Sequence, residues 1–146
     1  MRAIAWLSRK APLSGAFFLL LFGWQALYAD SCAPPAGADT VRVRSVHDGD
    51  TLTLSDGRRL RLIGINTPEV AGKEHDGEPL ALEARNRLRQ LLFRHGNRAL
   101  LLVGKEPTDH SGRTLGHLWS PDDKSITATM LSEGRGWQIS VPPNLA

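Results

Sequence analysis

Three short polar segments of this 146-residue chain carry the side chains best suited to chemistry. In chain order, they are "HDGDT" at 47–51, "NTPE" at 66–69 and "TDHSGR" at 108–113. Asp50, the amide of Asn66 and the backbone carbonyl of Thr67 offer the oxygen ligands that a hard cation such as calcium prefers. Glu69 follows three residues after Asn66. These residues predict an oxygen-lined cation site.

Two arginines stand close to these segments in the sequence. Arg61 lies five residues before Asn66, and Arg113 closes the third segment. Two planar guanidinium groups side by side would hold a phosphodiester and the charge that builds on it in the transition state. A carboxylate, a cation and two arginines form a site for phosphodiester hydrolysis, provided that Arg113 folds next to Arg61.

Other chemistries find no support in the sequence. No segment suggests a Ser-His-Asp triad, a cysteine nucleophile or a Gly-rich phosphate loop. The five histidines fall at no metal-ligand spacing, so a zinc site is not expected. The formal net charge of +3 is no argument for nucleic-acid binding, because it disappears when the basic residues Arg2, Arg9 and Lys10 are set aside.

Each segment also has a purely structural explanation. An Asp-Gly pair is favoured in tight turns, Asn66 and Pro68 can end a strand, and a Gly-containing β-turn accounts for the third segment. The expected geometry favours a site over these explanations. A hairpin about Asp56-Gly57 would fold two strands back on each other and bring Asp50 and Asn66 to the same end.

Residue patterns predict five strands and two helices. Strands are expected at 40–46, 51–55, 58–65, 98–103 and 114–120, and helices at 79–96 and 125–134. In the third strand, strict alternation would place Arg61 and Asn66 on opposite faces. Gly64 lies between them and predicts a bulge or a close backbone approach that lets both side chains converge.

The longer helix would begin at Pro79 and stop at Gly96. Its apolar face is predicted to consist of Leu80, Ala84, Leu88, Leu91 and Leu92. Three strands, a helix, two strands and a helix predict a mainly β, α+β domain. We expect a small, partly open, five-stranded barrel of the OB type, a fold that frequently binds nucleic acid.

The chain divides into three parts. Residues 1–29 have the basic start, apolar core and small final residue of a secretory signal, which predicts an exported protein, periplasmic or secreted, without stable membrane association after cleavage. An uncleaved membrane anchor formed by residues 12–29 is the alternative. Residues 30–39 read as a Pro-rich linker and residues 40–146 as one domain. Cys32 is the single cysteine, so no internal disulfide is possible.

The motifs "HDGDTLTL", "RLIGINTPE" and "TDHSGRTLGHL", in this order, resemble the staphylococcal nuclease (thermonuclease) family from about Val41 to Trp137. The resemblance implies an OB-fold nuclease that uses Ca²⁺ to cleave DNA and RNA, leaving 3′-phosphates and 5′-hydroxyls. It implies roles by residue. The implied calcium ligands are Asp50, Asn66 and Thr67; the implied general base or water-positioning group is Glu69; the implied phosphate clamps are Arg61 and Arg113. The loop at 71–78 would flank the active site, with Lys73 as a further substrate-binding residue.

Two departures from the family accompany the match. The best-known members have Asp where this chain has Asn66, and they usually continue into a third helix that is not expected here. We therefore expect low stability, or dimerisation through apolar surface near Trp137, Ile139 and Val141. The alternative function is a catalytically weak OB-fold module that binds nucleic acid or protein.

Overall fold

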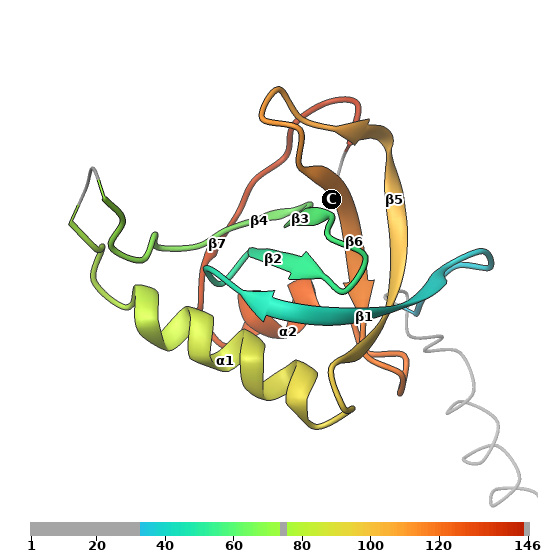
Figure 1. Ribbon diagram of the computed structural model, residues 1–146, viewed down its shortest axis with the longest axis horizontal. Helices are drawn as coiled ribbons and strands as arrows, with labels where there is room; N and C mark the ends of the chain where they lie inside the picture. The colour runs from blue at the N-terminus through green and yellow to red at the C-terminus, as the bar shows by residue number, and fades with distance from the viewer. Residues whose placement is uncertain (1–32, 74–75, 145–146) are drawn as a thin grey trace, which may run out of the picture. The chain divides into compact units, whose positions relative to one another are not determined.

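Five strands close into a barrel in the computed structural model, which describes residues 33–73 and 76–144 (Figure 1). They are β1 (Asp39–Val46), β2 (Thr51–Leu54), β3 (Arg59–Leu62), β5 (Arg98–Thr108) and β6 (Thr114–Trp119). The order around the barrel is β1-β2-β3-β6-β5, and β5 pairs again with β1. Only the β3–β6 pair is parallel. The predicted OB-type barrel is therefore confirmed, with its sheet fully closed.

Two helices cover part of the barrel, as predicted. Helix α1 (Ala81–Phe93) and helix α2 (Ile126–Ser132) pack against each other and contribute to one core. The core combines inward-facing residues of the strands with one face of each helix: Val43, Leu52, Leu54, Leu60, Leu62, Leu101 and Leu118 from strands, and Ala84, Leu88, Leu92, Ile126 and Met130 from helices. This arrangement is expected from alternation in the strands and 3.6-residue spacing in the helices.

The third predicted strand, 58–65, is in fact two strands. Strand β3 ends at Leu62, and β4 (Ile65–Asn66) belongs to a separate two-stranded sheet with β7 (Trp137–Gln138). The chain turns at Gly64, whose φ of +87° is a conformation that side chains with a Cβ rarely adopt. The glycine thus redirects the chain more sharply than the bulge expected from sequence.

Two predicted boundaries are also wrong. Helix α1 begins at Ala81 and not at Pro79, because Leu80 has a left-handed φ of +66° and is 62% exposed. The core face of α1 accordingly uses Ala81 in place of Leu80, with Leu91 only partly buried. Strand β5 runs on to Thr108 past the predicted end at 103, which shortens the turn before β6 to five residues, 109–113.

The segment after α2 packs back onto the barrel. Strand β7 pairs with β4, and a Cβ on Gly136 would lie 2.5 Å from the backbone oxygen of Asn66, so only glycine permits this approach. Further on, buried Asn144 accepts a hydrogen bond from Glu106 N–H at 3.0 Å and donates one to Glu106 C=O at 2.8 Å. Between these two attachments, Ile139 and Val141 are exposed.

The predictions for the first 32 residues, including the signal or anchor and Cys32, lie outside the described residues. Within the described residues, no helix is long and apolar enough to cross a membrane. The remainder of the predicted linker reaches β1, which already begins at Asp39. Dimerisation through Trp137, Ile139 and Val141 stays a prediction, and all three side chains are exposed in the monomer.

The Asn144 amide should anchor the C-terminal segment. We expect Asn144→Ala to lower the free energy of unfolding by about 1 to 2 kcal/mol, because both backbone groups of Glu106 lose a partner. A protease should then cleave the segment that follows Trp137 faster in Asn144→Ala than in the parent protein. Urea unfolding measures the first effect, and Ser140→Ala in the same exposed segment is the control. Equal stability of Asn144→Ala and the parent would contradict the anchor.

Candidate active site

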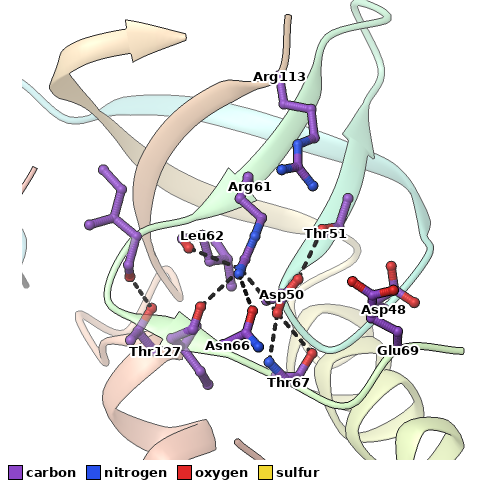
Figure 2. Close-up of polar contacts among 12 residues, drawn as sticks. Asp48, Asp50, Thr51, Arg61, Leu62, Asn66, Thr67, Glu69, Arg113 and Thr127 are labelled. Atoms are coloured by element: carbon purple, nitrogen blue, oxygen red, sulfur yellow. Dashed lines mark hydrogen bonds and ion pairs between the residues drawn. The ribbon is translucent and has the colours of Figure 1, made fainter. Parts of the chain in front are cut away.

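Asp50 lies at the centre of the polar cluster, immediately before β2. Its side chain is 7% exposed. One oxygen, Oδ2, accepts hydrogen bonds from the backbone N–H and the hydroxyl of Thr67, at 2.7 and 3.0 Å. The other, Oδ1, accepts the hydroxyl of Thr51 at 2.9 Å. Asp50 therefore ties the start of β2 to the end of β4 (Figure 2).

Gly49 lets this loop sit close to helix α1. A Cβ at position 49 would lie 2.8 Å from the Cβ of Ala84 and 2.9 Å from the side chain of Thr67. Real Cβ atoms do not approach their neighbours so closely. Glycine is thus required at position 49 by packing.

Arg61 reaches across the cluster from β3 (Figure 2). Its Nη1 forms an ion pair with Asp50 Oδ2 at 3.0 Å and donates to the carbonyl of Ile65 at 2.9 Å, while Nη2 donates to Asn66 Oδ1 at 2.7 Å. The side chain is 15% exposed. Among the described residues, the Nε–H and one Nη2 hydrogen keep no hydrogen-bond partner. The guanidinium is therefore held in place with donors still available.

The charge of Arg61 is set by competing effects. Burial lowers the pKa of Arg61, and the neighbouring charge of Arg113 lowers it further. The carboxylates of Asp50, Asp48 and Glu69 act in the opposite direction, but the pKa remains below its ordinary value. Because an arginine pKa lies far above neutrality, Arg61 is still charged at any physiological pH.

Arg113 enters the cluster from the turn before β6. Its guanidinium points toward Arg61 (Figure 2), as expected from the parallel pairing of Leu60 with Thr114. Asp109 fixes this orientation by accepting Arg113 Nε–H at 2.7 Å and the Arg113 backbone N–H at 2.9 Å. Burial would raise the pKa of Asp109, but these hydrogen bonds from Arg113 outweigh it and lower the pKa. Within residues 33–73 and 76–144, the hydrogen bonds and the ion pair of Arg113 use its Nε and backbone N–H, and neither Nη group has a partner.

Glu69 and Asp48 form the acidic side of the cluster (Figure 2). Glu69 is exposed, and its backbone is bound to Glu78 by two hydrogen bonds of 2.9 Å that close the base of the loop at 71–78. Asp48 Oδ1 accepts the N–H of Val70 at 3.1 Å, which places its carboxylate next to Glu69. A solvent-accessible carboxylate in this position can accept a proton from water.

The structure brings together six of the seven predicted site residues: Asp50, Arg61, Asn66, Thr67, Glu69 and Arg113. Lys73 is exposed in the following loop, and none of the contacts within the cluster involves it in the part of the chain that the structure describes. The side-chain oxygen of Asn66 accepts a hydrogen bond from Arg61, and its role as a cation ligand stays a prediction.

The sequence analysis did not predict two residues of the site, Asp48 and Asp109. Asp48 was available as a second acidic residue in "HDGDT", but alternation in a strand gave no sign that it would lie beside Glu69. Asp109 precedes Arg113 by four residues in "TDHSGR", a spacing at which a turn can return a carboxylate to a following arginine.

The oxygen chemistry of the cluster fits a hard cation with few charged ligands. Of the three predicted ligands, only Asp50 carries a charge, and its Oδ2 is already taken by Thr67 and Arg61. A lone pair remains on Asp50 Oδ1 and on Asn66 Oδ1. No group of three or more His, Cys, Asp and Glu side chains within residues 33–73 and 76–144 is arranged to hold a metal ion. The oxygen atoms that remain free fit a hard cation whose other ligands are water.

A cavity of about 380 Å³ opens beside the two arginines. Its polar side is formed by Arg61, Glu106, Asp109, His110, Arg113 and Asn144. Its apolar side is contributed by the turn at Gly64, by β6 and by the C-terminal segment: Ile63, Leu115, Ile139, Val141 and Pro142. A phosphate at the arginines would therefore have an apolar surface next to it.

The protein is thus a closed OB-type barrel with two arginines and three carboxylates in one cluster. Such a site is suited to binding a phosphate group. Comparison with known proteins agrees with that interpretation. The family model described as "Staphylococcal nuclease homologue" matches residues 59–144, and this chain belongs to that family.

Several curated proteins are similar to this chain. The thermonuclease of Staphylococcus intermedius is 34% identical over 105 residues, which cover 70% of this chain and 61% of that protein. Protein ParB of Escherichia coli is 33% identical over 117 residues, covering 72% and 60%. The thermonuclease of Staphylococcus hyicus is 34% identical over 87 residues, covering 58% and 50%. The chain thus spans between half and about three fifths of these relatives.

The Asp50–Arg61 ion pair should be energetically coupled. We expect Asp50→Asn and Arg61→Gln each to lower the free energy of unfolding by about 3 kcal/mol, because each leaves a largely buried partner uncompensated. The double variant should lose about 1 to 3 kcal/mol less than the sum of the two single losses in free energy of unfolding. Urea unfolding of the four proteins measures this coupling.

The exposed pair formed by Asp56 and Arg58 provides a matched control. The same substitutions at these two positions should show no measurable coupling, because solvent screens the charges. Additive effects of Asp50→Asn and Arg61→Gln would show that the ion pair does not organise the site.

Proposed function

We propose that this protein is a nuclease that hydrolyses phosphodiester bonds of DNA and RNA with little sequence specificity. The observation that carries the proposal is the convergence of Arg61 and Arg113 from adjacent strands, with unused guanidinium donors, opposite Asp50 and Glu69. A module that only binds nucleic acid needs the arginines but has no evident use for an exposed carboxylate next to them. Membership of the staphylococcal nuclease family and similarity to two thermonucleases support the same activity.

Each residue has a role in the proposed reaction. The free donors of Arg61 and Arg113 bind the two non-bridging oxygens of the phosphate and the additional negative charge of the transition state. Glu69 accepts a proton from the attacking water, since its carboxylate is exposed to solvent. As the water oxygen bonds to phosphorus, the P–O bond to the 5′-oxygen breaks, and that oxygen leaves as a hydroxyl after taking a proton from solvent. Asp109 acts as a positioning residue through its two hydrogen bonds to Arg113.

Calcium is the proposed cofactor. Asp50 Oδ1, Asn66 Oδ1 and the carbonyl of Thr67 are the groups that would hold it, with water completing the ligands. When bound, the ion supplies positive charge beside the phosphate. Asp50 would contribute Oδ1 to the ion, while its Oδ2 keeps the ion pair with Arg61.

The substrate class follows from the kind of contact that the site offers. Guanidinium groups and a cation address the phosphate, which is common to DNA and RNA. The apolar side of the 380 Å³ cavity, with Ile139 and Val141, offers a base only a non-polar surface. We therefore propose cleavage of single-stranded DNA and of RNA alike.

Export to the periplasm or the medium is also proposed, on the signal-like character of residues 1–29. A calcium-dependent enzyme with a weakly held ion would work better outside the cytoplasm, where sites with dissociation constants of about 10⁻⁴ to 10⁻³ M can fill. Detection of an N-terminus near residue 30 in the exported protein would support cleavage.

The purified protein should degrade single-stranded DNA and RNA in the presence of calcium and stop when a chelator is added. Glu69→Ala and Arg113→Ala should each reduce turnover by about 10² or more, because they remove the proton acceptor and a transition-state contact. Release of acid-soluble nucleotides measures the rates.

Arg58→Ala is the control for this experiment, since it removes an arginine from the β2–β3 turn. Undiminished cleavage in chelator would exclude calcium from the reaction. Full activity of Arg113→Ala would show that the turn at 109–113 does not belong to the site.

Replacement of Asn66 by Asp should strengthen calcium binding, because the added charge lies among the proposed ligands. The metal-free protein should not lose stability, since Arg61 already lies 2.7 Å from the side-chain oxygen of residue 66 and would offset repulsion from Asp50. The rise in melting temperature with calcium concentration measures affinity without relying on activity. Asn66→Ala is the matched variant with one ligand fewer. Identical calcium dependence in all three proteins would show that residue 66 is not a ligand.

A further inference from the structure

A second hollow lies on another part of the barrel, between β1 and helix α1. It is a groove of about 630 Å³ that is separate in its lining from the cavity at Arg61 and Arg113. Four of its lining residues come from β1 and the others from α1 and the turn that follows: Val43, Arg44, Ser45 and Val46, then Asn86, Arg89, Gln90, Leu92, Phe93 and Asn97.

The lining combines three kinds of side chain. Val43 and Leu92 are buried and form an apolar floor. Arg44 and Arg89 are exposed on opposite walls, and the lining contains no Asp or Glu. Within residues 33–73 and 76–144, neither arginine takes part in an ion pair. The groove therefore presents two uncompensated positive charges to solvent.

The α1 wall has a regular pattern. Asn86, Arg89, Gln90 and Phe93 follow one another at helical spacing and so share the face that looks toward β1. Phe93 is 78% exposed, although an aromatic ring of this size is normally at least half covered. An amide, a guanidinium, a second amide and an open aromatic ring thus line one side of the groove.

We propose that this groove binds a single-stranded segment of nucleic acid outside the cleaved linkage. The proposal rests on the proposed nuclease function and extends its substrate to several nucleotides. Arg44 and Arg89 provide guanidinium groups for two phosphates, and Phe93 provides a face on which a base can stack. The amides of Asn86, Gln90 and Asn97 can donate to phosphate or base oxygens.

Both walls of the groove lead to the candidate active site. On the β1 wall, Val46 precedes Asp48 by only two residues, or about 7 Å of extended chain. On the other side, α1 is packed against the site loop where Ala84 meets Gly49. The groove therefore begins within a few residues of the candidate active site on both of its walls.

The same features argue against other anionic partners. A concave surface with buried valine and leucine at its base has room for a flexible strand, whereas a bilayer surface would contact only its rim. An acidic protein segment would satisfy Arg44 and Arg89 but leave the exposed ring of Phe93 without a flat partner. Charge and an aromatic face together favour a nucleic-acid strand.

Binding should be measured in chelator, so that no cleavage is required. Fluorescence anisotropy of labelled oligothymidylates of 4 and 16 nucleotides measures binding to three proteins: the parent, Arg44→Gln/Arg89→Gln and Phe93→Ala. The double variant should bind the 16-mer about tenfold more weakly, as expected for two lost contacts between solvent-exposed charges. The slope of log affinity against log salt should fall by about 1.4, at roughly 0.7 per phosphate. Phe93→Ala should lose about fivefold or more.

The controls separate this proposal from the proposed function. The groove variants should weaken binding of the 4-mer less than binding of the 16-mer, because a 4-mer cannot span both the arginines of the active site and the groove, and Arg58→Gln should leave 16-mer binding unchanged. Unaltered 16-mer affinity and salt slope in Arg44→Gln/Arg89→Gln overturn the groove, whether or not the protein cleaves. An absence of cleavage by the parent protein overturns the nuclease proposal alone, since the binding comparison needs no turnover.

Two further arms test the competing partners. Charge reversal by Arg89→Glu, with melting temperature as the check on folding, should weaken 16-mer binding more than Arg89→Gln does. Vesicles containing phosphatidylglycerol and a polyglutamate peptide are titrated in parallel. The assignment to nucleic acid is overturned if the vesicles or the peptide bind through Arg44 and Arg89 while replacement of these arginines leaves 16-mer binding unchanged.

Discussion

The guanidinium of Arg61 is the group on which the site depends. It lies between Asp50 and Asn66, which come from different parts of the chain, and it also binds the carbonyl of Ile65. A lysine could supply the charge, but its compact ammonium lacks the planar fork with which Arg61 reaches these acceptors while keeping further N–H donors for a ligand. The burial that lowers the pKa of Arg61 also removes competing water, so its fixed orientation costs little when a phosphate arrives.

Packing around this group leaves no room for side chains at two positions. Gly49 lies against Ala84 and Thr67, and Gly136 lies against the backbone of Asn66. The site loops are thereby enclosed between helix α1 on one side and the C-terminal segment on the other. Neither glycine would be explained by the chemistry of the site, because neither contributes a functional group.

Local patterns in the sequence were sufficient for the barrel and for most of the site. Alternating Val and Arg residues located β1, and the Asp56-Gly57 turn brought Asp50 near Asn66, so the cluster was predictable from a hairpin and three motifs. Local patterns did not predict the division of β3 from β4, the extension of β5 or the left-handed backbone of Leu80. These features depend on contacts with distant segments, such as β7 for β4, which no local pattern reveals. The convergence of Arg61 and Asn66 across Gly64 was predicted, but the hydrogen bond that Asn66 Oδ1 accepts from Arg61 was not.

Because β4 pairs with β7 and not with the barrel, the site is divided between two parts of the fold that differ in stability. Asp50 and Arg61 belong to the closed barrel, whereas Asn66 lies on a ribbon of two short strands, which by itself is marginally stable in water. Such a ribbon can open locally while the barrel remains folded. Heating would then separate the two halves of the site before global unfolding, and amide hydrogen exchange would be faster at Ile65 and Trp137 than in β2. The working temperature range of the protein would be set by two strands of two residues each and not by its core.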